Sequence, residues 1–167
     1  NNGTVTDAVV NTTDCKFGNC FSFDGVDDLI NIGNGDSLNN FSDSMSVTAG
    51  IYLKGNGVTR YQIIVSKERW DESQHENDYF VFNIDNSTRK LSFGVYTNNL
   101  SNYTDDSDDP ILLNTWTYVV GTYNGSDILI YIDGVEQGSG PGTGGNIDSS
   151  NIDILVGGDT YNYFNGS

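Results

Sequence analysis

The sequence predicts an all-β domain folded as an antiparallel two-sheet β-sandwich. Three observations support this fold class: apolar and polar residues alternate with a period of two, clusters of Gly, Asn, Asp and Ser separate short apolar runs, and no long helical pattern occurs. A period of two with one apolar face is typical of antiparallel strands, and two such faces packed together form a sandwich. The length suits one domain, residues 1–167, around one hydrophobic core.

The predicted strands follow one another at short spacing along the chain. Alternation is clearest in Met45–Leu53, where Val47, Ala49 and Ile51 share one face. A second clear case is Ile128–Ile132. We expect strands near Thr4–Val10, Lys16–Phe23, Leu29–Ile32, Met45–Leu53, Gln62–Ser66, Tyr79–Ile84, Lys90–Val95, Thr115–Tyr123, Ile128–Ile132, Val135–Gln137 and Asp153–Gly157.

Three dipeptides are interpreted as type I′ hairpin turns: Asp24-Gly25, Asn124-Gly125 and Asp133-Gly134. Each tolerates the positive φ angles that this turn requires. Thr97–Asn114 and Gly138–Gly145 are predicted to be loops. The first loop carries an acidic run that lacks the ligand spacing of an EF-hand and is interpreted as solvated: Asp105, Asp106, Asp108 and Asp109.

The only two cysteines, Cys15 and Cys20, are interpreted as a disulfide that closes a short loop. Two free buried thiols are the alternative. With His75 as the only histidine, the chain lacks the ligands of a typical zinc site. A disulfide indicates an oxidising compartment, so we expect an extracellular or cell-surface protein.

The pattern N-x-S/T marks possible glycosylation sites, most of which fall in predicted turns. Some are expected by chance in a chain this rich in Asn, Ser and Thr. Glycosylation would agree with export from the cell. The asparagines of the pattern are Asn2, Asn11, Asn40, Asn86, Asn99, Asn102, Asn124 and Asn165.

The net charge of −16 excludes several partners. An acidic surface repels phosphate backbones and anionic membranes, so neither nucleic acid nor direct membrane docking is expected. No run of 18 apolar residues is present, so no membrane span is predicted. The acidity has three possible explanations: bound cations such as Ca²⁺, solubility on a crowded surface, or a salty habitat.

Several segments carry a family resemblance. They are CFSFDGVDDLINIG at Cys20–Gly33, NTWTYVVGTYNGSDILIYIDGVEQG at Asn114–Gly138, ILVGGDTYNYFNGS at Ile154–Ser167 and the I-I-x-K-like Ile64–Lys67. They resemble laminin-G-like domains of bacteria and archaea, which are concanavalin A-like lectin/glucanase jelly rolls. The resemblance implies a cell-surface jelly roll used for adhesion, glycan binding or scaffolding, often with a structural Ca²⁺, and suggests a prokaryotic source.

The chain departs from the family pattern at both ends. The usual first strand is absent or replaced by Asn1–Asn11, and the usual last strand does not follow Ser167. We therefore expect a jelly roll that lacks one or both terminal strands and has an exposed sheet edge. Either the chain is part of a larger surface protein, or a neighbouring subunit supplies the strand. Gly50 stands where the family usually has Trp, which implies a packing gap or a flatter sheet surface.

Two candidate sites are predicted. Asp24, Asp27 and Asp28 form an acidic cluster for Ca²⁺, although Asp24 would also serve an Asp-Gly turn. A glycan site is expected in the loop after Gln62–Ser66, unless Trp70 only packs on the sandwich edge. Trp116 and Tyr118 are expected in the core. The residues of the glycan site are Lys67, Arg69, Trp70, Asp71 and Tyr79, with His75 nearby.

Catalysis is not expected. Glycosidases need two carboxylates across the scissile bond, and the E-x-D-x-x-E and E-x-D-x-E motifs of related glucanases are absent. The first functional hypothesis is a non-catalytic extracellular module that binds glycans or surface proteins. A structural subunit of a glycosylated filament, completed by strand donation through self-association, is the alternative. A non-catalytic appendage of a secreted hydrolase is the third.

Overall fold

The chain folds as an antiparallel β-sandwich. A computed structural model describes residues 3–39, 43–68, 79–97, 100–103, 106–141, 144–148 and 151–167, with backbone only at 100–103 and 141. Strands dominate, and within these described ranges the one helical element is the short 3₁₀ helix η1 (Asp36–Leu38). The described residues contain no helix long and apolar enough to cross a membrane.

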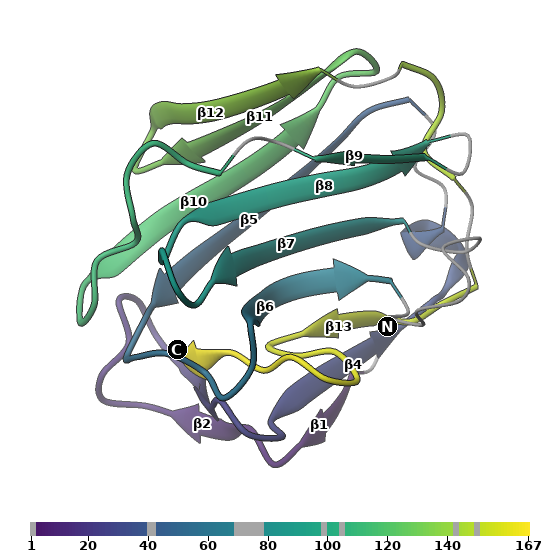
Figure 1. Cartoon of the computed structure of the whole chain (residues 1–167). Helices are drawn as coiled ribbons and strands as arrows, with labels where there is room; N and C mark the ends of the chain where they lie inside the picture. Colours follow the sequence, from purple (N-terminus) through teal and green to yellow (C-terminus); the bar gives the residue numbers. More distant parts are fainter. Residues whose placement is uncertain are drawn as a thin grey trace.

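One layer is a seven-stranded sheet (Figure 1). Every neighbouring pair in it is antiparallel. Its strands, in spatial order, are β1 (Thr4–Thr6), β4 (Leu29–Gly33), β13 (Ile154–Val156), β6 (Tyr61–Lys67), β7 (Phe80–Asp85), β8 (Leu91–Thr97) and β9 (Leu100–Tyr103).

The second layer is made of a four-stranded and a three-stranded sheet. Tyr52 and Ser167 join them, because the amide of each donates to the carbonyl of the other over 2.6 and 3.0 Å. The four-stranded sheet runs β12 (Val135–Pro141), β11 (Asp127–Ile132), β10 (Trp116–Tyr123) and β5 (Met45–Tyr52); the three-stranded sheet runs β14 (Asn165–Gly166), β3 (Cys20–Asp24) and β2 (Val9–Asn11).

The core lies between the apolar faces of the two layers. Phe82 and Phe93 of the seven-stranded sheet meet edge to face, with ring centroids 5.5 Å apart. Ile51, Val119 and other β-branched residues of the second layer complete the same buried cluster. Because inward positions alternate with exposed or half-buried ones along β5 and β10, the period-two prediction is confirmed.

The N-terminal segment differs from its predicted single strand. Asp7 has a φ of 58° and interrupts the extended chain between Thr6 and Ala8. As a result β1 pairs with β4 in the seven-stranded sheet, whereas β2 pairs with β3 in the other layer. The segment therefore passes from one layer to the other.

One of the three predicted type I′ turns is present. Asp133 and Gly134 have φ angles of 50° and 83° and join β11 to β12. The other two predictions are wrong. Asn124 has no positive φ, and its Oδ1 instead accepts the amides of Ser126 and Asp127 at 2.9 and 2.8 Å. Asp24-Gly25 makes no hairpin, because β3 and β4 lie in different sheets.

Three further predictions need correction. Thr97–Asn114, predicted as a loop, contains β9. Gly138–Gly145, also predicted as a loop, begins with residues of β12. Trp116 and Tyr118 are not core residues: they face away from buried Val119, Trp116 is half-buried, and Tyr118 is 51% exposed.

Among the described residues, β5 is without a strand partner along part of one side. One side of β5 pairs with β10 over its whole length. On the other side, Tyr52 bonds to Ser167, and the Lys54 amide bonds to the Asn165 carbonyl. Within the part of the chain that the structure describes, the rest of this side, residues 45–50, has no strand partner.

Candidate functional site

A crevice of about 380 Å³ lies on the outer face of the seven-stranded sheet. Phe80, Phe82 and Ile84 of β7 point into the core, so the residues between them point outward. The crevice lining combines an apolar floor with charged and polar groups: Arg60, Tyr61, Ile63, Glu68, Val81, Asn83, Asp85, Ser92, Asp106 and Asn162.

Asn83 is one of the polar residues that line this crevice. The residue is only 8% exposed, and its Oδ1 is buried with no hydrogen-bond partner among the residues that the structure describes. A buried acceptor that has lost water without gaining a donor costs about 1–3 kcal/mol. The cost would be offset by a ligand that brings a hydroxyl or N–H donor into the crevice.

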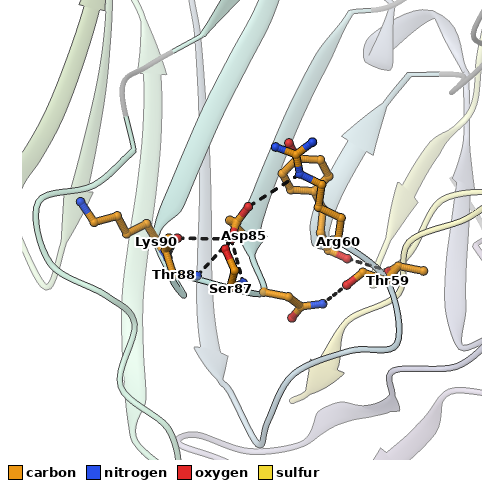
Figure 2. Close-up of polar contacts among 8 residues, drawn as sticks. Thr59, Arg60, Asp85, Ser87, Thr88 and Lys90 are labelled. Carbon is orange, nitrogen blue, oxygen red and sulfur yellow. Dashed lines mark hydrogen bonds and ion pairs between the residues drawn. The ribbon is translucent and has the colours of Figure 1, made fainter.

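Arg60 stands at the rim, over Tyr61. Its guanidinium carbon lies 4.9 Å from the Tyr61 ring centroid, and its Nε lies 4.0 Å from Oδ2 of Asp85. Figure 2 shows the Arg60 side chain reaching toward Asp85 while that of Lys90 points away from it. The Arg60 side chain is 78% exposed and offers several donors to a ligand.

Asp85 is held as a carboxylate. Its Oδ1 accepts the amides of Ser87 and Thr88 at 2.8 and 3.0 Å, and the Ser87 hydroxyl also donates to it (Figure 2). The Ser87 hydroxyl is the chief reason that the pKa of Asp85 is lowered, with the backbone amides adding to it. Asp85 therefore keeps its negative charge beside Arg60 at neutral pH.

Asn86 fixes the loop that carries Arg60. Its Nδ2 donates to the carbonyls of Thr59 and Gly57, and its Oδ1 accepts from Gln62 Nε2 at 2.6 Å. The residue is 9% exposed. Because the amide nitrogen is buried and donates two hydrogen bonds, the geometry argues against a glycan at this predicted site.

The structure places the other glycosylation candidates as follows. Asn124 is exposed, while Asn11 and Asn165 are half-buried. The Asn11 Oδ1 accepts the amides of Thr13 and Asp14, and the Asn165 Nδ2 donates to the Asn56 carbonyl. Asn2, Asn40 and Asn99 lie outside the described residues, and Asn102 is described by its backbone only.

The predicted glycan loop is only partly described. Arg69, Trp70, Asp71 and His75 lie outside the described residues. Lys67 and Tyr79 are described and are both fully buried, with exposures of 0%.

Lys67 and Tyr79 have structural contacts. Lys67 Nζ donates to Asn39 Oδ1 at 2.6 Å and to the Ile152 carbonyl at 2.7 Å, and the Tyr79 hydroxyl donates to the Asn39 carbonyl at 2.8 Å. Burial lowers the pKa of Lys67. These two residues tie η1 to the sheet and do not present their side chains to a ligand in solution.

The predicted acidic cluster is brought together. One carboxylate oxygen from each of Asp24, Asp27 and Asp28 lies within 4.8 Å of the others. Asp28 is buried, and its Oδ2 accepts the Asp24 amide at 2.7 Å. Burial is the main cause that raises the pKa of Asp28, and the charges of Asp24, Asp27 and Asp7 raise it further. Such a set of hard oxygen donors could hold a metal ion.

Cys15 and Cys20 form a disulfide, with their Cα atoms 5.6 Å apart. The bond closes the loop between β2 and β3. This loop carries Phe17, whose side chain is 85% exposed. The loop thus stands outside the core, at the edge of the second layer.

Two packed antiparallel layers define a β-sandwich domain of the jelly-roll class. The chain belongs to the concanavalin A-like lectin/glucanases superfamily, whose sequence model matches residues 24–167. Among curated proteins, none matches the chain.

Solved structures share the fold at low sequence identity. Domain 4 of AbnA, an extracellular GH43 arabinanase from Geobacillus stearothermophilus solved with arabinotriose, has a TM-score of 0.67 and 17% identity, over 98% of this chain and 77% of that one. Carbohydrate-binding module CBM66 from Bacillus subtilis has a TM-score of 0.53 and 16% identity, over 98% of this chain and 92% of that one. Domains LG4-5 of mouse laminin α1 have a TM-score of 0.53 and 13% identity, over 77% of this chain and 34% of that one.

The residues of the crevice were missed by the sequence analysis. Asn83 lies in the apolar run Tyr79–Ile84. The one sequence signal that could have marked it as a functional residue is that it is polar within a strand predicted to be buried. Arg60 lies in a polar segment with no pattern that marks it. Only the pairing of β6 with β7 brings Arg60 and Asp85 to the same end of the sheet.

Proposed function

We propose that this domain is a non-catalytic, extracellular carbohydrate-binding module that holds a glycan in the crevice on the seven-stranded sheet. Asn83 carries the proposal, because it lines a ligand-sized hollow and its buried Oδ1 has no hydrogen-bond partner among the described residues. Sugar hydroxyls both donate and accept, so they match Asn83 and the Arg60 guanidinium together. The disulfide and the carbohydrate-binding relatives support an extracellular setting.

A binding role fits the crevice carboxylate Asp85 better than an acid role in hydrolysis does. A glycosidase needs one carboxylic acid whose pKa is raised so that it can protonate the leaving group. The pKa of Asp85 is shifted in the opposite direction, and its Oδ1 is occupied by the turn that it stabilises. Asp85 is therefore suited to orienting Arg60 and a ligand, and unsuited to acting as an acid.

The proposal is tested by glycan-array screening followed by calorimetric titration of the best ligand. Asn83→Leu removes the unpartnered acceptor at nearly constant volume, so it should leave stability unchanged or slightly higher. It should nevertheless weaken binding roughly tenfold or more, as should Arg60→Ala. Lys90→Ala is the matched control, because Lys90 is not among the described residues that line the crevice and its side chain points away from Asp85. Unchanged binding by both crevice variants would reject this site.

We also propose that Asp24, Asp27 and Asp28 hold a structural Ca²⁺. The cluster supplies three carboxylates, while Ca²⁺ takes six to eight oxygens in all. Oδ2 of Asp28 and Oδ1 of Asp24 are engaged by backbone amides, which leaves the second oxygen of each carboxylate for an ion. The pKa of Asp28 is raised chiefly by burial and further by the charges of Asp24, Asp27 and Asp7, and a bound cation would offset this repulsion.

A subunit role completed by a donated strand is the second candidate, and the open side of β5 favours it. The amides and carbonyls of Ser46, Thr48 and Gly50 point to the same side as those of Tyr52, by the alternation of the strand. An added strand would pair there and extend the sheet. Sedimentation of the protein across a hundredfold concentration range tests this role: a monomer throughout would count against it.

A further inference from the structure

A second hollow lies on the opposite layer, over the outward face of β5 and β10. Trp116 pairs with Tyr52 across the two strands, and Tyr118 pairs with Gly50. The Tyr52 and Trp116 rings have centroids 5.6 Å apart at a 52° tilt. These outward aromatic rings form a floor beside Gly50, where an added Cβ would meet no atom within 4 Å.

The disulfide loop forms one wall over this floor. Phe17 and Lys16 line a cavity of about 410 Å³ together with Gly50, Trp116 and Tyr118. A neighbouring cavity of about 590 Å³ shares Trp116 and continues past Cys15. We call the two together the β5–β10 groove. Each is within the size range of small-molecule sites.

The charges of the first cavity are balanced. Lys16 and Asp133 both line it, and they are its only charged lining residues among those the structure describes. Asp133 is fixed in place because its Oδ1 accepts the Tyr118 amide at 2.8 Å. Its Oδ2 and the Trp116 Nε1 have no partner in the described part of the chain and are able to bond a ligand. Aromatic faces with a carboxylate and an ammonium at their edges suit a neutral ring that carries hydroxyls.

We propose that the β5–β10 groove is a second glycan site, which stacks a neutral pyranose ring on Trp116 and Tyr118 in the space left open by Gly50. The C–H face of the sugar lies on the aromatic floor. Its hydroxyls donate to Asp133 and accept from Lys16. The site lies on the outer face of the second layer and shares no residue with the crevice around Asn83, so the two sites bind independently.

The test uses neutral gluco- and xylo-oligosaccharides, with ligand-observed NMR and calorimetry. Gly50→Leu places a side chain in the hollow, and its Cβ would meet no atom within 4 Å, so the fold should be kept while groove binding is abolished. Trp116→Ala should weaken groove binding roughly tenfold. Thr48→Leu is the matched control. It places the same side chain on the same outward face of β5, two residues before Gly50 and opposite Val120. Unchanged binding in Gly50→Leu would overturn the proposal.

The crevice proposal and the groove proposal are separated by an Arg60→Ala/Asn83→Leu background. Neutral-sugar binding that survives in this background and is lost on adding Gly50→Leu supports the groove. If that background binds no sugar while the wild type does, the groove proposal fails and the crevice proposal stands. If the wild type binds no neutral sugar, the groove proposal fails. Binding of only an apolar dye, sensitive to Gly50→Leu, would also overturn it by showing an apolar surface instead.

Discussion

Phe93 of β8 lies with its ring directly on the backbone of Gly121 of β10. A Cβ at Gly121 would be 2.5 Å from Cγ of Phe93 and 2.8 and 2.9 Å from the two Cδ atoms. Gly121 and Phe93 belong to opposite layers, so this contact sets how closely the layers approach at the centre of the core. Glycine is required there for the close approach.

Substitution of Gly121 by alanine should therefore destabilise the domain. The ring of Phe93 is fully buried, so the added methyl group would overpack the core, and we expect a loss of about 1–3 kcal/mol in the free energy of unfolding. Urea denaturation measures it. Gly50→Ala is the control, since its Cβ would meet open space and should change stability by less than about 1 kcal/mol. Equal effects of both substitutions would contradict this account.

Asp85→Asn should make stability less sensitive to acid. Because the folded-state pKa of Asp85 is lowered, the folded protein binds this proton less readily than the unfolded chain does. The stability that the carboxylate contributes is present above the unfolded pKa of about 3.9 and is lost as the pH falls through the folded pKa. The difference between wild type and Asp85→Asn, measured by urea denaturation, should be largest near neutral pH and shrink below pH 4.

Calcium should stabilise the domain through the acidic cluster. The pKa of Asp28 is raised, so without a cation this group makes the protein less stable as the pH rises from the unfolded pKa through the folded one. Bound Ca²⁺ should reverse that trend and, at a hundredfold excess over Kd, add about 2.7 kcal/mol. Calorimetry with CaCl₂ against a chelator measures the shift in Tm.

The calcium prediction has a matched pair of variants. Asp27→Asn removes one exposed ligand of the cluster and should abolish most of the Tm shift. Asp36→Asn makes the same chemical change at an exposed position of η1 and should keep the shift. A Tm that is the same with calcium and with chelator would show that the cluster is only an acidic turn.

Removal of the disulfide should affect the groove more than the crevice. A Cys15→Ser/Cys20→Ser variant loses a short covalent loop, which is worth roughly 2 kcal/mol by chain entropy. The same loop carries Lys16 and Phe17 over the β5–β10 groove. We expect binding in the groove to weaken and binding in the crevice to persist. Calorimetry on the two single-site backgrounds reads these affinities separately, and equal loss in both would point to general unfolding.

The strand pattern was readable from the sequence because alternation is local. Val119 is buried and Tyr118 is exposed, as period two requires, yet both are apolar enough to resemble core. Trp116 and Tyr118 were therefore assigned to the wrong face. The strand β9 was missed because Leu100–Tyr103 has little apolar pattern, and it exists through its pairing with β8.

The candidate sites also differ in whether they depend on local sequence or on tertiary structure. The residues of the acidic cluster lie within one short turn, so the sequence was enough to predict that they meet. The crevice depends on which strands are neighbours and on the register that sets Tyr61 opposite Asp85. At Asn124, the side chain accepts two amides and closes a different turn from the one that the Asn-Gly dipeptide favours. The Asn124 side chain competes with backbone carbonyls for these amide donors and so determines the turn geometry. The Asn-Gly dipeptide alone does not reveal which acceptor is used.

The crossing of the N-terminal segment between layers has a mechanical consequence. A pulling force applied ahead of Thr4 acts on β1 before it acts on β2. The bend at Asp7 lies between the two strands, so the force on β1 need not act on β2 until β1 has detached. The edge strand β1 would peel from β4 while β2 stays paired with β3 and Ala8 stays in the core. The domain would then yield in steps under tension, first giving up a short length of chain while the sandwich beneath it stays closed.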